Sequence, residues 1–163
     1  MSGGGAALPG GVKLALDWGE RRIGVAACDP AETLAYPVAT VDGADPWPAL
    51  AALAAEHRPA AVVVGWPRRL DGTAGLAADR AAARAAEAAT RLGVGVWLVD
   101  ERLTTAEASR KLAHAGRSAK AQRRVVDQQA AVGILESVLA ARRAGRPIGA
   151  AVAPAVANEE ATR

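Results

Sequence analysis

The strongest constraint on the fold is a strand–helix–strand pattern in the middle of the chain. The run "AAVVVGWP" (Ala60–Pro67) is β-branched and almost uninterrupted, and "VGVWLVDE" (Val94–Glu101) has the same character. Between them, an Ala-rich segment from about Leu76 to Leu92 is followed by Gly93, which predicts a helix closed by a glycine. Strands joined in this way are parallel, and uniformly apolar strands are covered on both faces. The chain is therefore predicted to be an α/β protein.

The N-terminal part of the chain predicts an antiparallel extension of that sheet. Two short apolar runs, Val12–Asp17 and Ile23–Cys28, flank a Gly-containing turn, a pattern typical of a β-hairpin. A third run, Leu34–Val41, leads into a Pro-rich loop. A first helix is expected from Pro48 to His57, with proline in its first turn. The predicted sheet is consequently mixed.

Two helices are expected after the last parallel strand. The segment Thr104–Glu107 has the Thr-x-x-Glu form of a capping box and opens a helix that ends near Gly116. Ser118 can cap a final helix that runs to about Ala144. The order of elements is a hairpin, a strand–helix–strand unit and two helices.

The two ends of the chain lack the periodicity of packed elements. Residues 1–11 are small and uncharged, and residues 145–163 alternate proline and alanine, so both are expected to be loose tails around one domain, residues 12–144. No basic residue precedes Lys13, and no apolar run is long enough for a signal peptide or a membrane span. Cys28 is the single cysteine and is expected to be a small buried side chain. We therefore expect a cytoplasmic protein that does not contact a membrane.

Positive charge is concentrated in one segment. The net charge is +3, but six basic residues and no acid lie between Glu107 and Asp127, so that segment carries +6 and the remainder 3 − 6 = −3. These residues are Arg110, Lys111, Arg117, Lys120, Arg123 and Arg124. Such a patch indicates either an anionic partner or a solvated helical surface.

One acid lies on the apolar side of the last predicted helix. At about 100° per residue, Ala131, Ile134 and Val138 fall within about 40° of Asp127, whereas Glu136 falls on the far side. Asp127 therefore faces the sheet. Burying an unpaired carboxylate costs several kcal/mol, so Asp127 needs a partner. An arginine, the helix dipole or a metal ion could each supply it.

Three other acids end two apolar strands. Asp17 closes the first predicted strand, and Asp100 and Glu101 close the last parallel one, pointing to opposite faces. Either of the latter pair could simply bind Arg102 or cap the next helix. If the two strands are close, however, Asp17, one of this pair and Asp127 converge. Three carboxylates that converge favour hard divalent cations, Mg²⁺ or Mn²⁺, and two such ions can promote phosphodiester hydrolysis.

Four blocks of the sequence together resemble the YqgF/RuvX family. They are "DWGERRIGVAACDP", "VVVGWPRRLDGTAG", "VDERLTT" and "VVDQQAAVGILESVL", in this order and at natural spacing over roughly Val12–Ala144. Members of this family are described as Holliday-junction resolvases and as nucleases that mature the 5′ end of pre-16S rRNA. The resemblance implies an RNase H-like fold, a five-stranded mixed β-sheet flanked by α-helices.

The resemblance also implies which residues act. It assigns Asp17, Glu101 and Asp127 as metal-binding catalytic acids, holding Mg²⁺ or Mn²⁺, and two ions are expected. It places Arg21 and Arg22 where phosphate contacts are expected. The full set of residues expected to bind nucleic acid is Arg21, Arg22, Arg68, Arg69, Arg102, Arg117, Lys120, Arg123 and Arg124. Arg68 and Arg69 depart from the family pattern, in which an apolar residue is often followed by asparagine.

Three functions remain open at this point. The first is a metal-dependent nuclease acting on branched DNA or pre-rRNA, and a resolvase of two-fold symmetric junctions is expected to be a homodimer. The second is a non-catalytic nucleic-acid-binding or ribosome-assembly factor whose acids hold metal without turnover. The third is a sugar-kinase- or actin-like ATPase, which also opens its domains with Asp-x-Gly on a hairpin. That class needs two such domains, and this chain has room for one.

Overall fold

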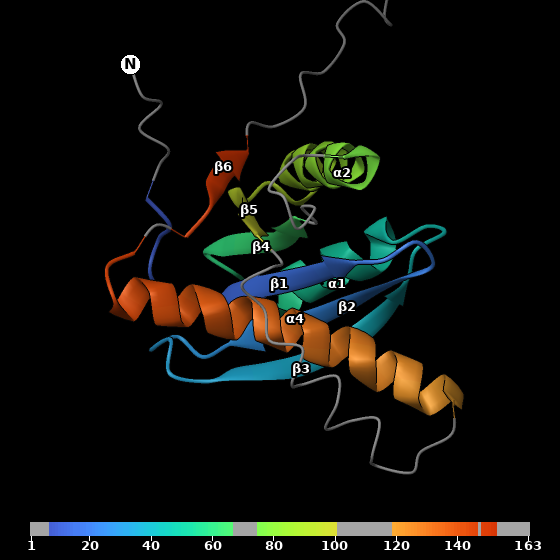
Figure 1. The fold of residues 1–163 in the computed structure, drawn as a ribbon, viewed down its shortest axis with the longest axis horizontal. Coiled ribbons are helices and arrows are strands. Elements are labelled where there is room, and N and C mark those ends of the chain that lie inside the picture. Colours follow the sequence, from blue (N-terminus) through green and yellow to red (C-terminus); the bar gives the residue numbers. More distant parts are fainter. Residues whose placement is uncertain (1–6, 67–74, 101–118, 147, 153–163) are drawn as a thin grey trace, which may run out of the picture.

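The computed structural model describes residues 7–66, 75–100, 119–146 and 148–152 of the chain. Three strands come first, and helices and strands then alternate along the sequence (Figure 1). In chain order they are β1 (Lys13–Trp18), β2 (Arg22–Cys28), β3 (Ala35–Asp42), α1 (Trp47–His57), β4 (Ala61–Trp66), α2 (Leu76–Leu92), β5 (Val96–Asp100), α4 (Ala119–Arg143) and β6 (Ala150–Val152). The elements predicted for this part of the chain are confirmed to within a few residues. The helix expected after Thr104 lies outside the described residues.

The strands form one mixed sheet in the order β3-β2-β1-β4-β5-β6. β1 pairs antiparallel with β2 and parallel with β4, and β4 pairs parallel with β5. The α/β class, the hairpin and the parallel unit are therefore confirmed. The expected strand number, five, is one too low for the described residues, because β6 pairs antiparallel with β5. Without β6, β5 would be an edge strand with unpaired backbone groups.

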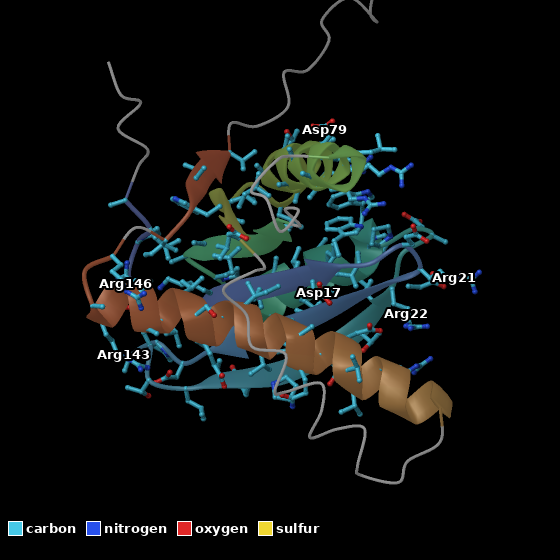
Figure 2. All side chains as sticks on the ribbon, viewed as in Figure 1. Asp17, Arg21, Arg22, Asp79, Arg143 and Arg146 are labelled. Atoms are coloured by element: carbon cyan, nitrogen blue, oxygen red, sulfur yellow. The ribbon has the colours of Figure 1, made fainter. Side chains whose placement is uncertain are left out.

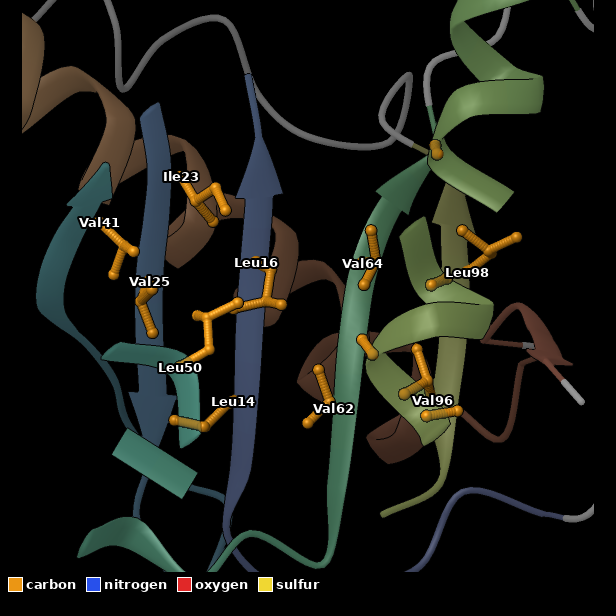
Figure 3. Close-up of a cluster of buried hydrophobic side chains, with 14 of the residues drawn as sticks. Leu14, Leu16, Ile23, Val25, Val41, Leu50, Val62, Val64, Val96 and Leu98 are labelled. Atoms are coloured by element: carbon orange, nitrogen blue, oxygen red, sulfur yellow. The ribbon is translucent and has the colours of Figure 1, made fainter. Parts of the chain in front are cut away.

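One face of the sheet is covered by α1 and α2. Side chains alternate along each strand, so one set points toward these helices and forms a continuous apolar cluster (Figure 3). Its fully or nearly fully buried members include Leu14, Leu16, Ile23, Val25, Leu50, Val62, Val64, Val96 and Leu98. Each such side chain contributes about 1.5–3 kcal/mol to folding through the removal of apolar surface from water.

The other face is covered by α4, which lies across β1, β2 and β3 (Figure 1). The helical stripe predicted from the sequence is confirmed, because Ala131, Ile134 and Val138 are buried and Glu136 is exposed. Cys28 is also buried on this face, and burial raises the pKa of its thiol. Among the described residues, none of the helices combines the length and apolar character that crossing a bilayer requires.

Parts of both predicted tails pack onto the domain. In the N-terminal segment, Leu8 is buried, and its carbonyl oxygen accepts a hydrogen bond of 2.6 Å from Nη1 of Arg142. In the C-terminal segment, Ile148 packs against the α4-side core and β6 extends the sheet. Leu8, Ile148 and β6 therefore contact the domain from outside the expected bounds, 12–144. The pairing of β6 left no hydrophobic period in the sequence, because its short run of small side chains buries little.

A partly buried ion cluster joins three segments at the C-terminal end of α4. Lys13 in β1 has no solvent exposure, and its ammonium group donates to the carbonyl oxygen of Gly11 at 2.8 Å and to the carboxylate of Glu32. Nε of Arg142 lies 2.7 Å from the same carboxylate. Burial raises the pKa of Glu32, but its bonds to Lys13 and Arg142 outweigh this, and the pKa lies below its ordinary value of 4.5. The cluster ties the first strand to the last helix.

We expect Glu32→Gln to lower the free energy of unfolding by about 2 kcal/mol at neutral pH, because Lys13 loses its charged partner inside the protein. Since the pKa of Glu32 is lowered on folding, its contribution is present above pH 4.5 and is lost as the pH falls below that value. Urea unfolding of wild type and variant from pH 7 to pH 3 checks this. The exposed Glu136→Gln is the control, with a change within about 0.5 kcal/mol. An equal deficit at pH 7 and pH 3 would contradict the assignment.

Candidate active site

The carboxyl ends of β1, β4 and β5 lie along one edge of the sheet, because these strands are parallel to one another. Asp17 is the penultimate residue of β1, and Asp100 is the last residue of β5. Both are partly buried. Open α/β sheets place their ligand sites outside the carboxyl ends of their strands. This edge is therefore the candidate site.

The two strand-end acids point to opposite faces. Asp17 alternates with Ala15, which packs under α4, whereas its neighbour Trp18 packs against Trp47 of α1 with ring centroids 5.6 Å apart. Asp100 alternates with Leu98, which belongs to the cluster under α1 and α2. Asp17 consequently shares the α4 face with Val99, not with Asp100. Glu101, the predicted ligand from this strand, lies outside the described residues.

Gly24 allows α4 to approach the sheet beside Asp17. In the β1–β2 register, Gly24 is the direct partner of Asp17. A Cβ atom placed on Gly24 would lie 1.8 Å from the backbone carbonyl oxygen of Asp127 and 3.0 Å from the nitrogen of Gln128. Only glycine fits this contact. Because opposed residues of an antiparallel pair have Cα atoms about 4.5–5.5 Å apart, Asp17 and Asp127 lie in the same part of the site.

Asp127 has a charged partner in the described structure. Nε of Arg22, at the start of β2, donates a 2.7 Å hydrogen bond to Oδ2 of Asp127. The two side chains retain 34% and 22% of their exposure, so the pair is partly solvated. An Asp–Arg pair is one of the partners that the sequence had left open for this acid. Arg22 therefore occupies one carboxylate oxygen of Asp127, and its guanidinium group lies at the edge of the site.

Beside this pair lies a small basic hollow of about 260 Å³. It is lined by Arg21, Arg22, Thr40, Val41, Asp42 and Arg124. Figure 2 shows Arg21 and Arg22 at the tip of the β1–β2 hairpin, at the opposite end of the molecule from Arg143 and Arg146. The turn is narrow because the amide of Gly19 donates to the carbonyl oxygen of Arg22 at 2.9 Å. Three arginines among its lining residues make the hollow suited to an anion.

Thr40 and Gln128 were not identified from the sequence, although they hold the wall of the hollow. The Thr40 hydroxyl donates to the carbonyl oxygen of Arg124 at 3.1 Å and accepts from Nε2 of Gln128 at 3.0 Å. These bonds fasten the first part of α4 to β3. Gly24 was also missed, but an isolated glycine inside a strand pattern is a recognisable sign of close backbone approach.

Several of the predicted site residues fall, wholly or in their side chains, outside the part of the chain that the structure describes. Arg68, Arg69, Arg102 and Arg117 lie outside the described residues, as does Glu101. Lys120 and Arg123 belong to α4, but their side chains are outside the described part. The structure therefore brings together Asp17, Asp127, Arg21, Arg22 and Arg124.

The donor set of the described site suits a hard cation. Asp17 and Asp127 offer carboxylate oxygens from two elements that meet at Gly24, and oxygen is the donor that Mg²⁺ and Mn²⁺ prefer. Within the described ranges, no group of three or more His, Cys, Asp or Glu side chains stands at metal-binding distances. The predicted third ligand, Glu101, falls in the gap after residue 100.

Comparison with solved structures supports the fold. A structure described as "T. thermophilus RuvC in complex with Holliday junction substrate" aligns with a TM-score of 0.51, covering 85% of this chain and 99% of its own, at 15% identity. At that identity the likeness shows the architecture alone. The arrangement fits the RNase H-like fold expected from the sequence.

Comparison with known sequences identifies the family. The Cutibacterium acnes protein described as "Putative pre-16S rRNA nuclease" is 50% identical over 139 residues, covering 83% of this chain and 86% of its own. A Streptomyces coelicolor protein of the same description is 48% identical over 147 residues, covering 87% and 88%. Residues 11–141 match the family model described as RuvX, Holliday junction resolvase. The chain therefore belongs to the RuvX family.

Proposed function

We propose that this protein is a divalent-metal-dependent nuclease that hydrolyses phosphodiester bonds in structured nucleic acid. The observation that carries the proposal is the contact at Gly24, which brings the α4 residue Asp127 against the strand partner of Asp17. Two acids far apart in sequence therefore lie in the same part of the candidate site, next to a hollow lined by arginines. Family membership and the names of the relatives agree with this chemistry.

The acids and the arginines have separate roles in this proposal. Asp17, Asp127 and Glu101 would hold Mg²⁺ or Mn²⁺, and two ions are expected. The bound ions would supply an activated water and neutralise charge that develops on the phosphate. Arg21, Arg22 and Arg124 bind and orient the backbone phosphates, and affinity for nucleic acid consequently falls as the salt concentration rises.

The descriptions of the family and of its members suggest two candidate substrates. The family model is described as a Holliday junction resolvase, and the relatives are described as pre-16S rRNA nucleases. We propose branched DNA, pre-16S rRNA near its 5′ end, or both. Cutting a junction symmetrically requires two active sites, so the DNA reaction predicts a homodimer in solution, whereas trimming an RNA end does not.

A second candidate function is a nucleic-acid-binding or ribosome-assembly factor without turnover. The observation that favours it is the Arg22–Asp127 ion pair, because a neutralised carboxylate is a weaker metal ligand. In this case the arginines still bind phosphate, but the acids stabilise the fold.

A cleavage assay with metal removal tests the first function against the second. Wild-type protein is incubated with a four-way DNA junction or with a pre-16S 5′-leader transcript, in Mg²⁺, in Mn²⁺ or in EDTA. We expect cleavage of at least one substrate with metal, and a rate at least about 10³-fold lower in EDTA, since the metal contributes several kcal/mol. Linear duplex DNA and mature 16S rRNA are the controls. Undiminished cleavage in EDTA contradicts metal dependence, and binding of both substrates without cleavage supports the second function.

A further inference from the structure

Arg22 belongs to two neighbouring sites at once. Its Nε donates to Oδ2 of Asp127 at 2.7 Å, and Arg22 is also one of the residues that line the hollow with Arg21 and Arg124. With 34% of its side-chain exposure retained, Arg22 is not locked inside the protein. A small rotation of a long side chain therefore suffices to exchange one partner for the other.

The charges of the hollow are unbalanced without an anion. Its lining carries three arginines and one acid, Asp42, whose Oδ1 accepts the backbone amide of Ala44 at 3.0 Å. Within the described residues, Arg22 is the member of this trio that forms a salt bridge, and its partner Asp127 lies outside the lining. A phosphodiester anion in the hollow would restore the balance.

The walls around Arg22 are held in place, so the exchange does not require the fold to move. Thr40 joins β3 to the first part of α4 through Arg124 and Gln128. The amide of Gly43 donates to the carbonyl oxygen of Arg21 at 2.8 Å, which fastens the hairpin tip to the end of β3. Only the Arg22 side chain needs to change its partner.

We propose that Arg22 is an exchangeable counter-ion, which neutralises Asp127 when no divalent cation is bound and binds a nucleic-acid phosphate when Asp127 ligates one. This inference rests on the proposed function. Asp127 cannot give its full charge to a cation and to Arg22 together, so the released guanidinium completes a three-arginine phosphate site. By linkage, cation binding and phosphate binding each strengthen the other.

The first test measures the affinity for Mn²⁺ alone, from the signal of free Mn²⁺ in electron paramagnetic resonance at fixed ionic strength. Arg22→Gln is expected to bind Mn²⁺ about 5- to 10-fold more tightly than wild type, because the competing charge beside Asp127 is removed. Arg22→Lys keeps that charge and is expected to change the affinity less than about 2-fold. The matched control is Arg21→Gln, which removes a charge from the same hollow but not from Asp127.

The second test measures the affinity for a four-way DNA junction in EDTA by fluorescence anisotropy, and does not need Arg22→Gln to fold. Asp127→Asn releases Arg22 without metal, so it is expected to bind the junction about 5-fold more tightly than wild type. Asp42→Asn removes the same charge from the hollow without releasing Arg22, and its gain is expected to stay below about 2-fold.

The outcomes separate this inference from the function on which it rests. Wild type that binds Mn²⁺ with the same affinity as Arg22→Gln overturns the exchange and leaves the nuclease proposal standing. Equal gains for Asp127→Asn and Asp42→Asn likewise overturn the exchange. If neither wild type nor Arg22→Gln binds Mn²⁺, both the exchange and metal dependence are wrong. Tighter Mn²⁺ binding by Arg22→Gln with a larger gain for Asp127→Asn supports the exchange.

Discussion

Asp17→Asn is expected to lower the rate of metal-dependent cleavage by at least about 10³-fold while nucleic-acid binding in EDTA is retained. The substitution keeps the size of the side chain but removes the charge that would hold the cations, and the metal supplies several kcal/mol of transition-state stabilisation. Binding is retained because the arginines of the hollow are untouched. Single-turnover cleavage of the preferred substrate, with anisotropy on the same samples, measures both quantities.

Asp100→Asn is the matched control for Asp17→Asn. Asp100 lies at the same edge of the sheet, but it alternates with Leu98 and so belongs to the face opposite α4. We expect its rate to stay within about 10-fold of wild type, the range of an indirect effect on a neighbouring residue. A protein with Asp17→Asn that cleaves at the wild-type rate contradicts the assignment of Asp17. A larger loss from Asp100→Asn would show that Asp100, and not Glu101, is the acid that acts with Asp17.

Gly24→Ala is expected to reduce cleavage by about 10²-fold and to lower the free energy of unfolding by about 1–3 kcal/mol. Its Cβ would lie 1.8 Å from the backbone oxygen of Asp127, so α4 must move away from β2 by more than 1 Å to restore van der Waals contact. That movement separates Asp127 from Asp17, and a displacement of about 1 Å at a catalytic group costs about 10²-fold in rate. Urea unfolding and single-turnover cleavage measure the two effects.

Gly10→Ala provides the control for adding a methyl group. A Cβ on Gly10 would find its nearest neighbours at 3.6 Å and 3.8 Å, which are ordinary contact distances. Stability is therefore expected to stay within about 0.5 kcal/mol of wild type, with cleavage unchanged. Wild-type cleavage by Gly24→Ala would show that the distance between α4 and β2 does not position the acids.

Local patterns predicted most of the secondary structure, because they depend on neighbouring residues. The uniformly apolar run Ala61–Trp66 is the central strand that its sequence indicated, and the Ala-rich helix ends at Gly93 in the left-handed conformation. The stripe containing Ala131 and Ile134 correctly predicted which side of α4 faces the sheet. Periodicity did not predict β6, since three small residues at the sheet edge form backbone bonds and bury little.

The sequence predicted which acids belong to the candidate site, but it predicted fewer of the contacts between them and other residues. Asp17 at the end of a strand and Asp127 on a buried helical stripe were both singled out as acids in apolar surroundings. Which arginine would reach Asp127 was not predictable, because Arg22 lies 105 residues earlier in the chain. The closeness of α4 to β2 at Gly24 was also missed, because an isolated glycine in a strand indicates a close approach but not which element approaches.

The sequence by itself determined the strands, the helices, the face of α4 that is buried and the family, because alternation, helical periodicity and ordered motifs are encoded among nearby residues. Only the tertiary structure decided that Asp127 rests over the strand partner of Asp17, that Arg22 is shared between this acid and a basic hollow, and that Glu32 holds Lys13 to Arg142. Each of these contacts joins residues on different elements. Their distances depend on how closely the layers pack, and no local pattern records that quantity.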